Sequence, residues 1–177
     1  MEKVKVATLW FDGCSGCHMS LLDMDERLID LAGVMEVVYS PLVDNKEFPE
    51  EVDVTIIEGA VSYDEDYEKL RKIRARTKIL VALGDCAVAG NVPTLRNPFS
   101  VDEVLARAYT ETADAGSGLP RESLPRLLPF VVPLHDVIDV DVFVQGCPPS
   151  ADVIHYVISE LAAGRTPDLT DKTRPGA

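Results

Sequence analysis

Short apolar runs alternate with amphipathic segments along most of the chain. The runs cover residues 3–11, 35–43, 52–61, 78–84 and 140–146, and each has the length of a strand. They are nearly continuous in apolar residues, which is typical of parallel strands that are buried on both faces. The alternation therefore predicts an α/β fold, a doubly wound parallel sheet of about five strands in a three-layer sandwich. Five strands suggest a flavodoxin-like order, although the pattern alone does not fix it.

The segments between these runs carry helical spacing and helix-terminating signals. Residues 19–32 place leucine and isoleucine on one face, and Gly33 follows as a stop signal. Ser62 and Glu65 have the spacing of a capping box at the start of the next helix. That helix is predicted to end in the basic run RKIRAR (71–76), because cations suit a helix C-terminus.

The second half of the chain is less regular. Residues 91–134 are expected to be mostly loop, with one helix that begins at a capping box of Ser100 and Glu103. A last helix follows the motif PPSAD, and its apolar residues share one face: Val153, Ile154, Val157, Ile158 and Leu161. We expect residues 1–164 to form a single domain and residues 165–177 to be a polar, loosely held C-terminal tail.

Composition narrows the class of protein. The chain has 177 residues, a length that suits one domain, and 46% of them are apolar. Its net charge of −13 argues against a nucleic-acid partner, because phosphate binding requires clustered lysine and arginine. No signal peptide and no apolar run long enough to span a membrane is visible, so we expect a cytoplasmic protein.

The four cysteines follow the ends of predicted strands. Cys14 and Cys17 come after the first strand, Cys86 after the fourth and Cys147 after the fifth. Doubly wound sheets bind their ligands beyond the carboxyl ends of the strands, so the four thiols are predicted to meet at one edge. In a reducing cytoplasm such thiols are better candidates for metal or redox chemistry than for structural disulfides.

Three kinds of thiol site fit this set. Structural zinc usually takes two C-x2-C pairs, and a C-x-x-C that opens a helix can be a thioredoxin-type dithiol. One pair and two single cysteines, each within two positions of a glycine, instead fit the corners of a 4Fe–4S cluster, which needs one thiolate per iron. The spacing favours the cluster over zinc, and zinc over the dithiol.

Four motifs in this order resemble a known family. WFDGCSGCHMSLLDMDE, IIEGAV, GDCAVAGNVPTLRN and PLHDVIDVDVFVQGCPPSAD are similar to segments of nickel–iron hydrogenase small subunits, especially the cytoplasmic, bidirectional NAD(P)-linked type. The resemblance covers nearly the whole chain up to the tail. A weaker resemblance is to the cluster-bearing subunit of NADH:quinone oxidoreductase, whose pattern has adjacent cysteines where this chain has CSGC.

The resemblance implies an electron-transfer subunit that is not catalytic alone. It implies one proximal 4Fe–4S cluster on Cys14, Cys17, Cys86 and Cys147, and a flavodoxin-like fold. It further implies a large subunit with the nickel–iron centre and diaphorase subunits that carry FMN and iron–sulfur clusters. Electrons would pass between the H2-activating centre and NAD(P) through this chain. Some members of this type are thought to bind FMN in the small subunit, and we keep that as a further hypothesis.

Departures from the family pattern concern the proton route. Many relatives place a glutamate directly before the first cysteine, where this chain has Gly13, with Asp12 one position earlier. The family's EG pair corresponds to Glu58 and Gly59, and Glu58 is either part of a proton or water path or a cap or turn carboxylate. His18 could bond a cluster sulfide or face a partner, but a solvent-facing or capping histidine fits equally. Cysteines for further clusters and a twin-arginine export signal are absent.

Overall fold

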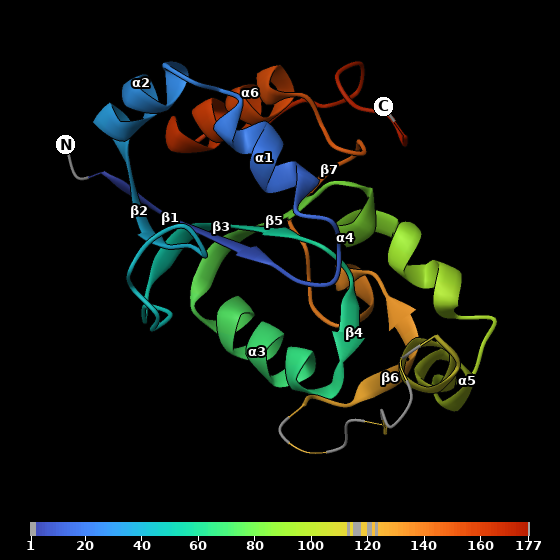
Figure 1. The fold of residues 1–177 in the computed structure, drawn as a ribbon. Helices are drawn as coiled ribbons and strands as arrows, with labels where there is room; N and C mark the ends of the chain where they lie inside the picture. The colour runs from blue at the N-terminus through green and yellow to red at the C-terminus, as the bar shows by residue number, and fades with distance from the viewer. Residues whose placement is uncertain (1–2, 113, 115–117, 120–121, 123, 177) are drawn as a thin grey trace.

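The computed structural model describes residues 3–112, 114, 118–119, 122 and 124–176 of the chain. Five parallel strands form its central sheet in the order β2-β1-β3-β5-β7 (Figure 1). Their bounds are β1 (Val4–Trp10), β2 (Met35–Tyr39), β3 (Val52–Glu58), β5 (Thr77–Leu83) and β7 (Val142–Val144). When these five strands alone are numbered in chain order, their arrangement in the sheet is 2-1-3-4-5, which is the flavodoxin-like order. The prediction of a doubly wound parallel sheet is confirmed.

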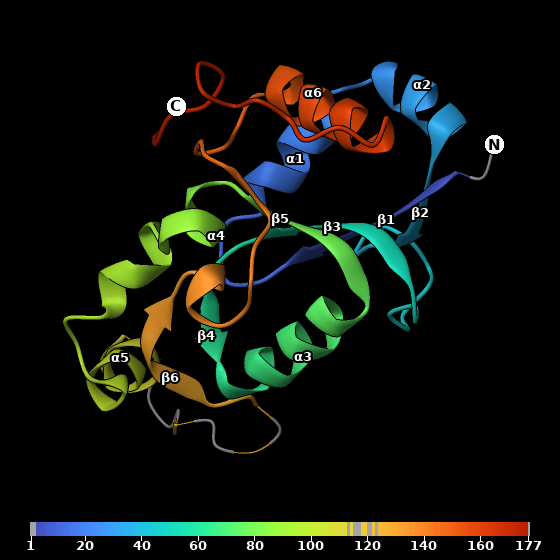
Figure 2. The same ribbon diagram turned by 180° about the vertical axis from the view of Figure 1, so that it is seen from behind.

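Helices cover both faces of the sheet, which gives the predicted three layers (Figures 1 and 2). One face carries α1 (Gly16–Leu22), α2 (Arg27–Val34) and α6 (Ala151–Ala162), and the other carries α3 (Asp64–Ala75) and α4 (Asp85–Ala89). Each face has its own buried apolar cluster, one that includes Leu31 and Ile154 and one that includes Leu70 and Ala87. The apolar face predicted for the last helix is the face of α6 that is buried.

Two predicted elements are divided in the structure. Residues 19–32 form no continuous helix: α1 ends at Leu22, and Asp25 adopts a left-handed φ of 51° before α2 begins. The strand expected over residues 52–61 is interrupted at Gly59, whose φ is +87°. In both places the chain turns sharply, and the pattern of apolar residues does not predict the turn.

A small antiparallel sheet of two strands was not predicted. It pairs β4 (Val61–Tyr63) with β6 (Leu127–Val132), and β6 lies within the stretch expected to be mostly loop. Around it lie the 3-10 helices η1 (Val92–Arg96) and η3 (Leu134–Asp136), α5 (Val101–Ala106) and the π-helical η2 (Arg107–Glu111). A strand of six residues that contains a proline and pairs with a partner more than sixty positions away leaves only a weak local signal.

One of the two predicted capping boxes is wrong. At α3 it is Asp66, not Glu65, that accepts the backbone N–H groups of Ser62 and Tyr63, at 3.1 and 2.9 Å. The Ser62 hydroxyl donates instead to the carboxylate of Asp12. At α5 the predicted box is confirmed, because Ser100 and Glu103 exchange side chain–backbone hydrogen bonds.

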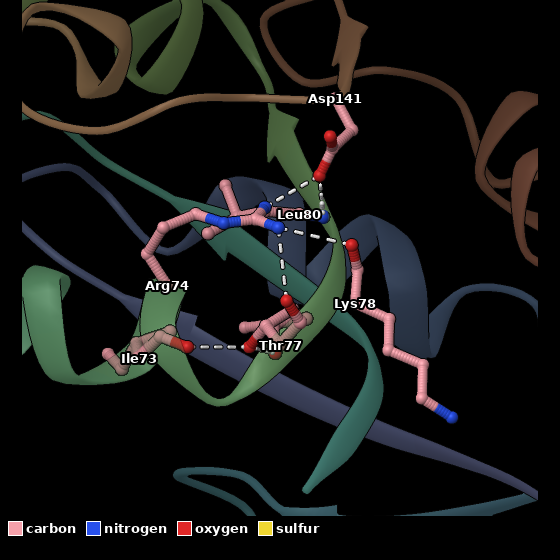
Figure 3. A network of polar contacts seen from close by, with 7 residues as sticks. Ile73, Arg74, Thr77, Lys78, Leu80 and Asp141 are labelled. Atoms are coloured by element: carbon pink, nitrogen blue, oxygen red, sulfur yellow. Dashed lines mark hydrogen bonds and ion pairs between the residues drawn. The ribbon is translucent and has the colours of Figure 1, made fainter.

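A polar network supports β7, which has only three residues, at the amino end of the sheet (Figure 3). Asp141 Oδ2 accepts from Arg74 Nη1 at 2.6 Å and from the backbone N–H of Leu80 at 2.7 Å. Arg74 Nη2 also donates to the carbonyls of Thr77 and Lys78, at 3.0 and 3.1 Å. The network ties the residue before β7 to β5 and so fixes the strand that leads to Cys147.

The C-terminal tail makes defined contacts although it was expected to be loosely held. Leu169 packs against the apolar cluster beneath α6. The backbone N–H of Gly176 donates to Asp85 Oδ2 at 2.6 Å. Among the described residues, no helix is both long and apolar enough to cross a bilayer.

Candidate metal centre

The four cysteines lie on three loops at the carboxyl edge of the sheet. Cys14 is in the turn after β1, Cys17 in the first turn of α1, Cys86 in α4, and Cys147 beyond the end of β7. Figures 1 and 2 both show α1, α4 and the chain beyond β7 close together. Cys14 and Cys147 are exposed, Cys17 and Cys86 are half-buried, and all four are free thiols.

Glycine backbones let the sulfur atoms approach the loops closely. A Cβ on Gly84 would lie 2.3 Å from Cys17 Sγ, so the sulfur rests directly against the loop that carries Cys86. Gly84 also has a φ of +83°, which side chains rarely adopt. A Cβ on Gly16 would lie 3.2 Å from Cys14 Sγ and 4.0 Å from the ring of Pro148. These contacts join all three loops.

Backbone hydrogen bonds fasten the loops of Cys86 and Cys147 to each other. The Gly84 N–H donates to the carbonyl of Val144 at 2.7 Å, and the Asp85 N–H to that of Gly146 at 2.9 Å. The Gly146 N–H donates back to Asp85 Oδ1 at 2.8 Å. On the other side, the Ser20 hydroxyl of α1 donates to the carbonyl of Pro149 at 2.5 Å. The thiols are therefore held on a connected frame.

The thiols are also coupled electrostatically. Burial raises the pKa of the Cys17 thiol, and the nearby Glu58, Cys86 and Cys14 raise it further. Burial likewise raises the pKa of Cys86, followed by the charge of Cys147 and then by that of Cys14, although a hydrogen bond from a backbone N–H opposes this rise. Each thiolate therefore opposes ionisation of its neighbours, and a set of four requires a compensating positive charge.

The donor set fits a metal–sulfur group. Thiolates select zinc, copper(I) or iron–sulfur clusters. A single zinc ion needs its sulfurs about 2.3 Å from one point. Within the part of the chain that the structure describes, no three His, Cys, Asp or Glu side chains converge so as to hold one metal ion.

Glu58 and His18 form a buried pair beside Cys17. Each is 2% exposed, and Glu58 Oε2 accepts the His18 backbone N–H at 2.7 Å and lies 3.1 Å from His18 Nδ1. Glu58 also lies beside Cys17, and after burial its charge is the next cause of the raised pKa of that thiol. Because Ser15 makes no side-chain cap at the start of α1, the carboxylate of Glu58 performs that role from β3. The solvent-facing alternative for His18 is wrong.

The pair continues into a chain of buried hydroxyl groups. His18 Nε2 lies 3.0 Å from Thr8 Oγ1, and Thr8 Oγ1 donates to Ser40 Oγ at 2.8 Å. The ring of Trp10 meets that of His18 edge-on, with centroids 5.2 Å apart. Nothing in the sequence singled out Thr8 or Ser40, since a lone hydroxyl inside a strand carries no spacing signal.

Two other residues near the thiols escaped sequence reasoning. Asn91 Nδ2 lies 3.4 Å from Cys147 Sγ, within hydrogen-bonding range of sulfur. Asp85 is buried between the loops of Cys86 and Cys147. A charged residue inside the otherwise apolar run LGDCAVAG was the one signal that could have revealed Asp85. A Cβ on Gly13 would lie 3.4 Å from the Cα of Gly59, so the backbones of these two glycines lie close together.

Comparison with known proteins identifies the family. Residues 14–161 match the family described as NADH ubiquinone oxidoreductase, 20 Kd subunit, and the chain belongs to it. The NAD-reducing hydrogenase HoxS subunit delta of Cupriavidus necator is 41% identical over 94% of this chain and 82% of its own length. A subunit of the F420-non-reducing hydrogenase of Methanothermobacter marburgensis is 39% identical over 95% of this chain but only 56% of its own length.

A solved structure narrows the identification. A crystal structure of NAD+-reducing [NiFe]-hydrogenase in the H2-reduced state contains a chain with a TM-score of 0.94 and 38% identity. The match covers 99% of this chain and 100% of that one. Within its family, the chain is a small subunit of the nickel–iron hydrogenase type, and it is thus a component of an oxidoreductase enzyme. The resemblance seen in the four sequence motifs is confirmed.

Proposed function

We propose that the chain passes electrons through one 4Fe–4S cluster held by Cys14, Cys17, Cys86 and Cys147. The observation that supports this most is the gathering of four cysteines, from three loops, at one edge of the sheet, where neighbouring cysteines raise the pKa values of Cys17 and Cys86 after burial. The cluster would supply one-electron transfer. The chain's own residues would supply thiolates, a fixed frame, and N–H donors to sulfur, which tune a cluster potential.

We infer a large subunit as the direct partner. All four cysteines of the chain are used by the cluster, so no thiolate is left for nickel, and H2 activation falls to another chain. The NAD-reducing relatives further support a diaphorase module with FMN and iron–sulfur clusters, which would exchange electrons with NAD(P). With one cluster only, electrons would leave this chain directly for a cluster or flavin of that module. We place the complex in the cytoplasm.

For Glu58 we propose a place on a proton or water path in addition to its capping role. It is the first member of the buried polar chain that continues through His18, Thr8 and Ser40. Glu58→Gln keeps an oxygen that can cap α1 but removes the carboxylate. We expect this variant to retain iron and to slow H/D exchange by the complex. Unchanged exchange at full iron content would contradict the proposal.

FMN is a second candidate cofactor. Flavodoxin-like sheets bind FMN beyond the carboxyl ends of their strands. Here the turn after β1 is committed to cysteines, but a groove of about 180 Å3 opens beside it, lined by Trp10, Tyr39, Lys46 and Lys69 among others. Aromatic and cationic side chains suit an isoalloxazine ring and a phosphate. Flavin analysis of the small and large subunits purified together tests this, and absence of flavin at full iron content rules it out.

One purification separates the main alternatives. The complex is isolated from its native host without oxygen, and iron, nickel, zinc and acid-labile sulfide are measured. We expect at least four irons and four sulfides per small subunit, the excess belonging to the partner chains, with broad visible absorption and nickel in a co-purifying chain. One zinc in a colourless protein would support a zinc-stabilised binding module, and a partner without nickel would support a quinone oxidoreductase-like complex.

A further inference from the structure

Asp85 is a buried carboxylate that ligation by the thiols does not explain. It directly precedes Cys86, and only 8% of it is exposed. Its Oδ1 atom accepts the N–H of Gly146, the residue before Cys147, at 2.8 Å. Its Oδ2 atom accepts the N–H of Gly176, ninety-one positions along the chain, at 2.6 Å. One side chain therefore joins two cysteine loops and the C-terminal tail.

The tail reaches Asp85 from a second, separate anchor on α6. The hydroxyl of Tyr156 accepts the N–H of Asp168 at 3.3 Å, and Lys172 Nζ lies 4.6 Å from the centre of the Tyr156 ring. Leu169 packs into the apolar cluster nearby. Between the anchor and Asp85, a cavity of about 380 Å3 separates the tail from the loop after Cys147. Figure 2 shows the red tail running along α6 toward this loop.

The presence of a carboxylate at position 85 is explained by the hydrogen bonds that its two oxygens accept. A carboxylate beside a set of thiolates is electrostatically unfavourable. An uncharged asparagine would avoid this repulsion, but it has an NH2 group in place of one oxygen, so one of the two backbone N–H groups would face a donor instead of an acceptor. The contacts with Gly146 and Gly176 use both acceptor oxygens. These two hydrogen bonds thus offset the unfavourable charge.

We propose that Asp85, Gly146 and Gly176 form a clamp, which we call the tail clamp, that holds the Cys86 and Cys147 loops at the spacing a cluster requires. Asp85 is a positioning residue, and the tail closes the clamp only while the two loops are together. The inference rests on the proposed function, because the spacing of the loops affects function only if the loops hold a cluster.

Coupling between two sites is reciprocal in binding free energy. A closed clamp therefore strengthens binding of the cluster, and a bound cluster favours the closed clamp to the same extent. Lys172 is exposed at the Tyr156 anchor, and the bond after it leads to the four residues that reach Asp85, so trypsin cleavage after this residue reports release of that end of the tail. We expect cleavage to be slower in the iron-loaded complex than in the same complex after iron removal.

The test uses the complex as purified, with three small-subunit variants. The first ends at Arg174, which removes the Gly176 donor and leaves the Tyr156 anchor. The second is Asp85→Asn. The third, Asp152→Asn, changes an exposed carboxylate on α6 that pairs with Arg27 and serves as the matched control. Iron release to a chelator, the EPR spectrum of the reduced protein, and thermal unfolding are measured for each.

We expect both clamp variants to lose iron about tenfold faster than wild type and to broaden the EPR signal, with Asp152→Asn unchanged. Because both changes open the same clamp, truncation of Asp85→Asn should add no further loss. Wild-type iron release rates in the truncated chain, or equal trypsin cleavage with and without iron, would overturn the inference. Wild-type complex without iron would instead overturn the proposed function.

Discussion

Gly84 offers a direct test of the geometry of the metal centre. In Gly84→Ala the new Cβ would lie 2.3 Å from Cys17 Sγ, whereas ordinary contact begins at 3.4 Å, so the two atoms must separate by a further 1.1 Å. That displacement is nearly half of a metal–sulfur bond of about 2.3 Å. The sulfur of Cys17 would leave its position as a ligand, and the loop of Cys86 would shift with it.

A second cost comes from the backbone at this position. A side chain at the φ of +83° costs about 1–2 kcal/mol. For a chain of this length, that cost lowers the melting temperature by about 2–8 °C. Gly164→Ala is the matched control, because Gly164 has a φ of +71° but nothing within 4 Å of its Cβ position. It incurs the backbone cost without the contact with sulfur.

The assay compares both variants in the purified complex. Iron and sulfide content, the EPR signal of the reduced protein and the melting temperature are recorded together. We expect Gly84→Ala to lose most of its iron and its EPR signal, and Gly164→Ala to lose a few degrees of stability with full iron. If Gly84→Ala retains the wild-type iron content and EPR spectrum, binding of iron does not require the close contact between Cys17 Sγ and the backbone of Gly84, and the reasoning fails.

Three further predictions concern stability and pH. Asp141→Ala removes the acceptor of the Leu80 N–H and the partner of Arg74, so urea unfolding should show a loss of about 1–3 kcal/mol. Ser100→Ala removes the cap of α5 and should cost about 1 kcal/mol in the same assay. In the metal-free chain the raised pKa values of Cys17 and Cys86 mean that folding favours the protonated thiols. Its free energy of unfolding should therefore fall as pH rises above the ordinary thiol value of 9.0, which alkaline urea titrations would check.

The sequence predicted the sheet well because its signals are local. Nearly continuous apolar runs mark buried parallel strands, and the alternation with helices determines the layers. The predictions fail where contacts between residues far apart in the sequence determine the local structure. Asp66 rather than Glu65 caps α3, since Ser62 is drawn to Asp12, and β6 exists only because β4 is beside it. The predicted first helix is interrupted at Asp25, where the sequence has no glycine or proline that would predict an interruption.

In the candidate site, too, the local features could be predicted from the sequence and the tertiary contacts could not. The position of each cysteine after a strand is readable from the sequence, and topology then brings the cysteine loops to one edge. The surroundings of the thiols are not readable in this way. Glu58 meets His18 across forty positions, and Asp85 meets Gly176 across ninety-one, so their roles depend on tertiary packing. The ligation itself remains a prediction.

The wide separation of the cysteine loops also bears on how the protein is made. Cys17 leaves the ribosome 130 residues before Cys147, and at about 5–20 residues per second this interval lasts roughly 7–26 s. During that time Cys14 and Cys17 are already present and Cys86 is added, while the strand that leads to the fourth cysteine, β7, does not yet exist. The nascent chain thus passes through a stage with oxidisable, unshielded sulfur. If the proposed cluster is bound by all four cysteines, iron can be inserted only after Cys147 has been synthesised, and a carrier that protects the early thiols would then raise the yield of loaded subunit.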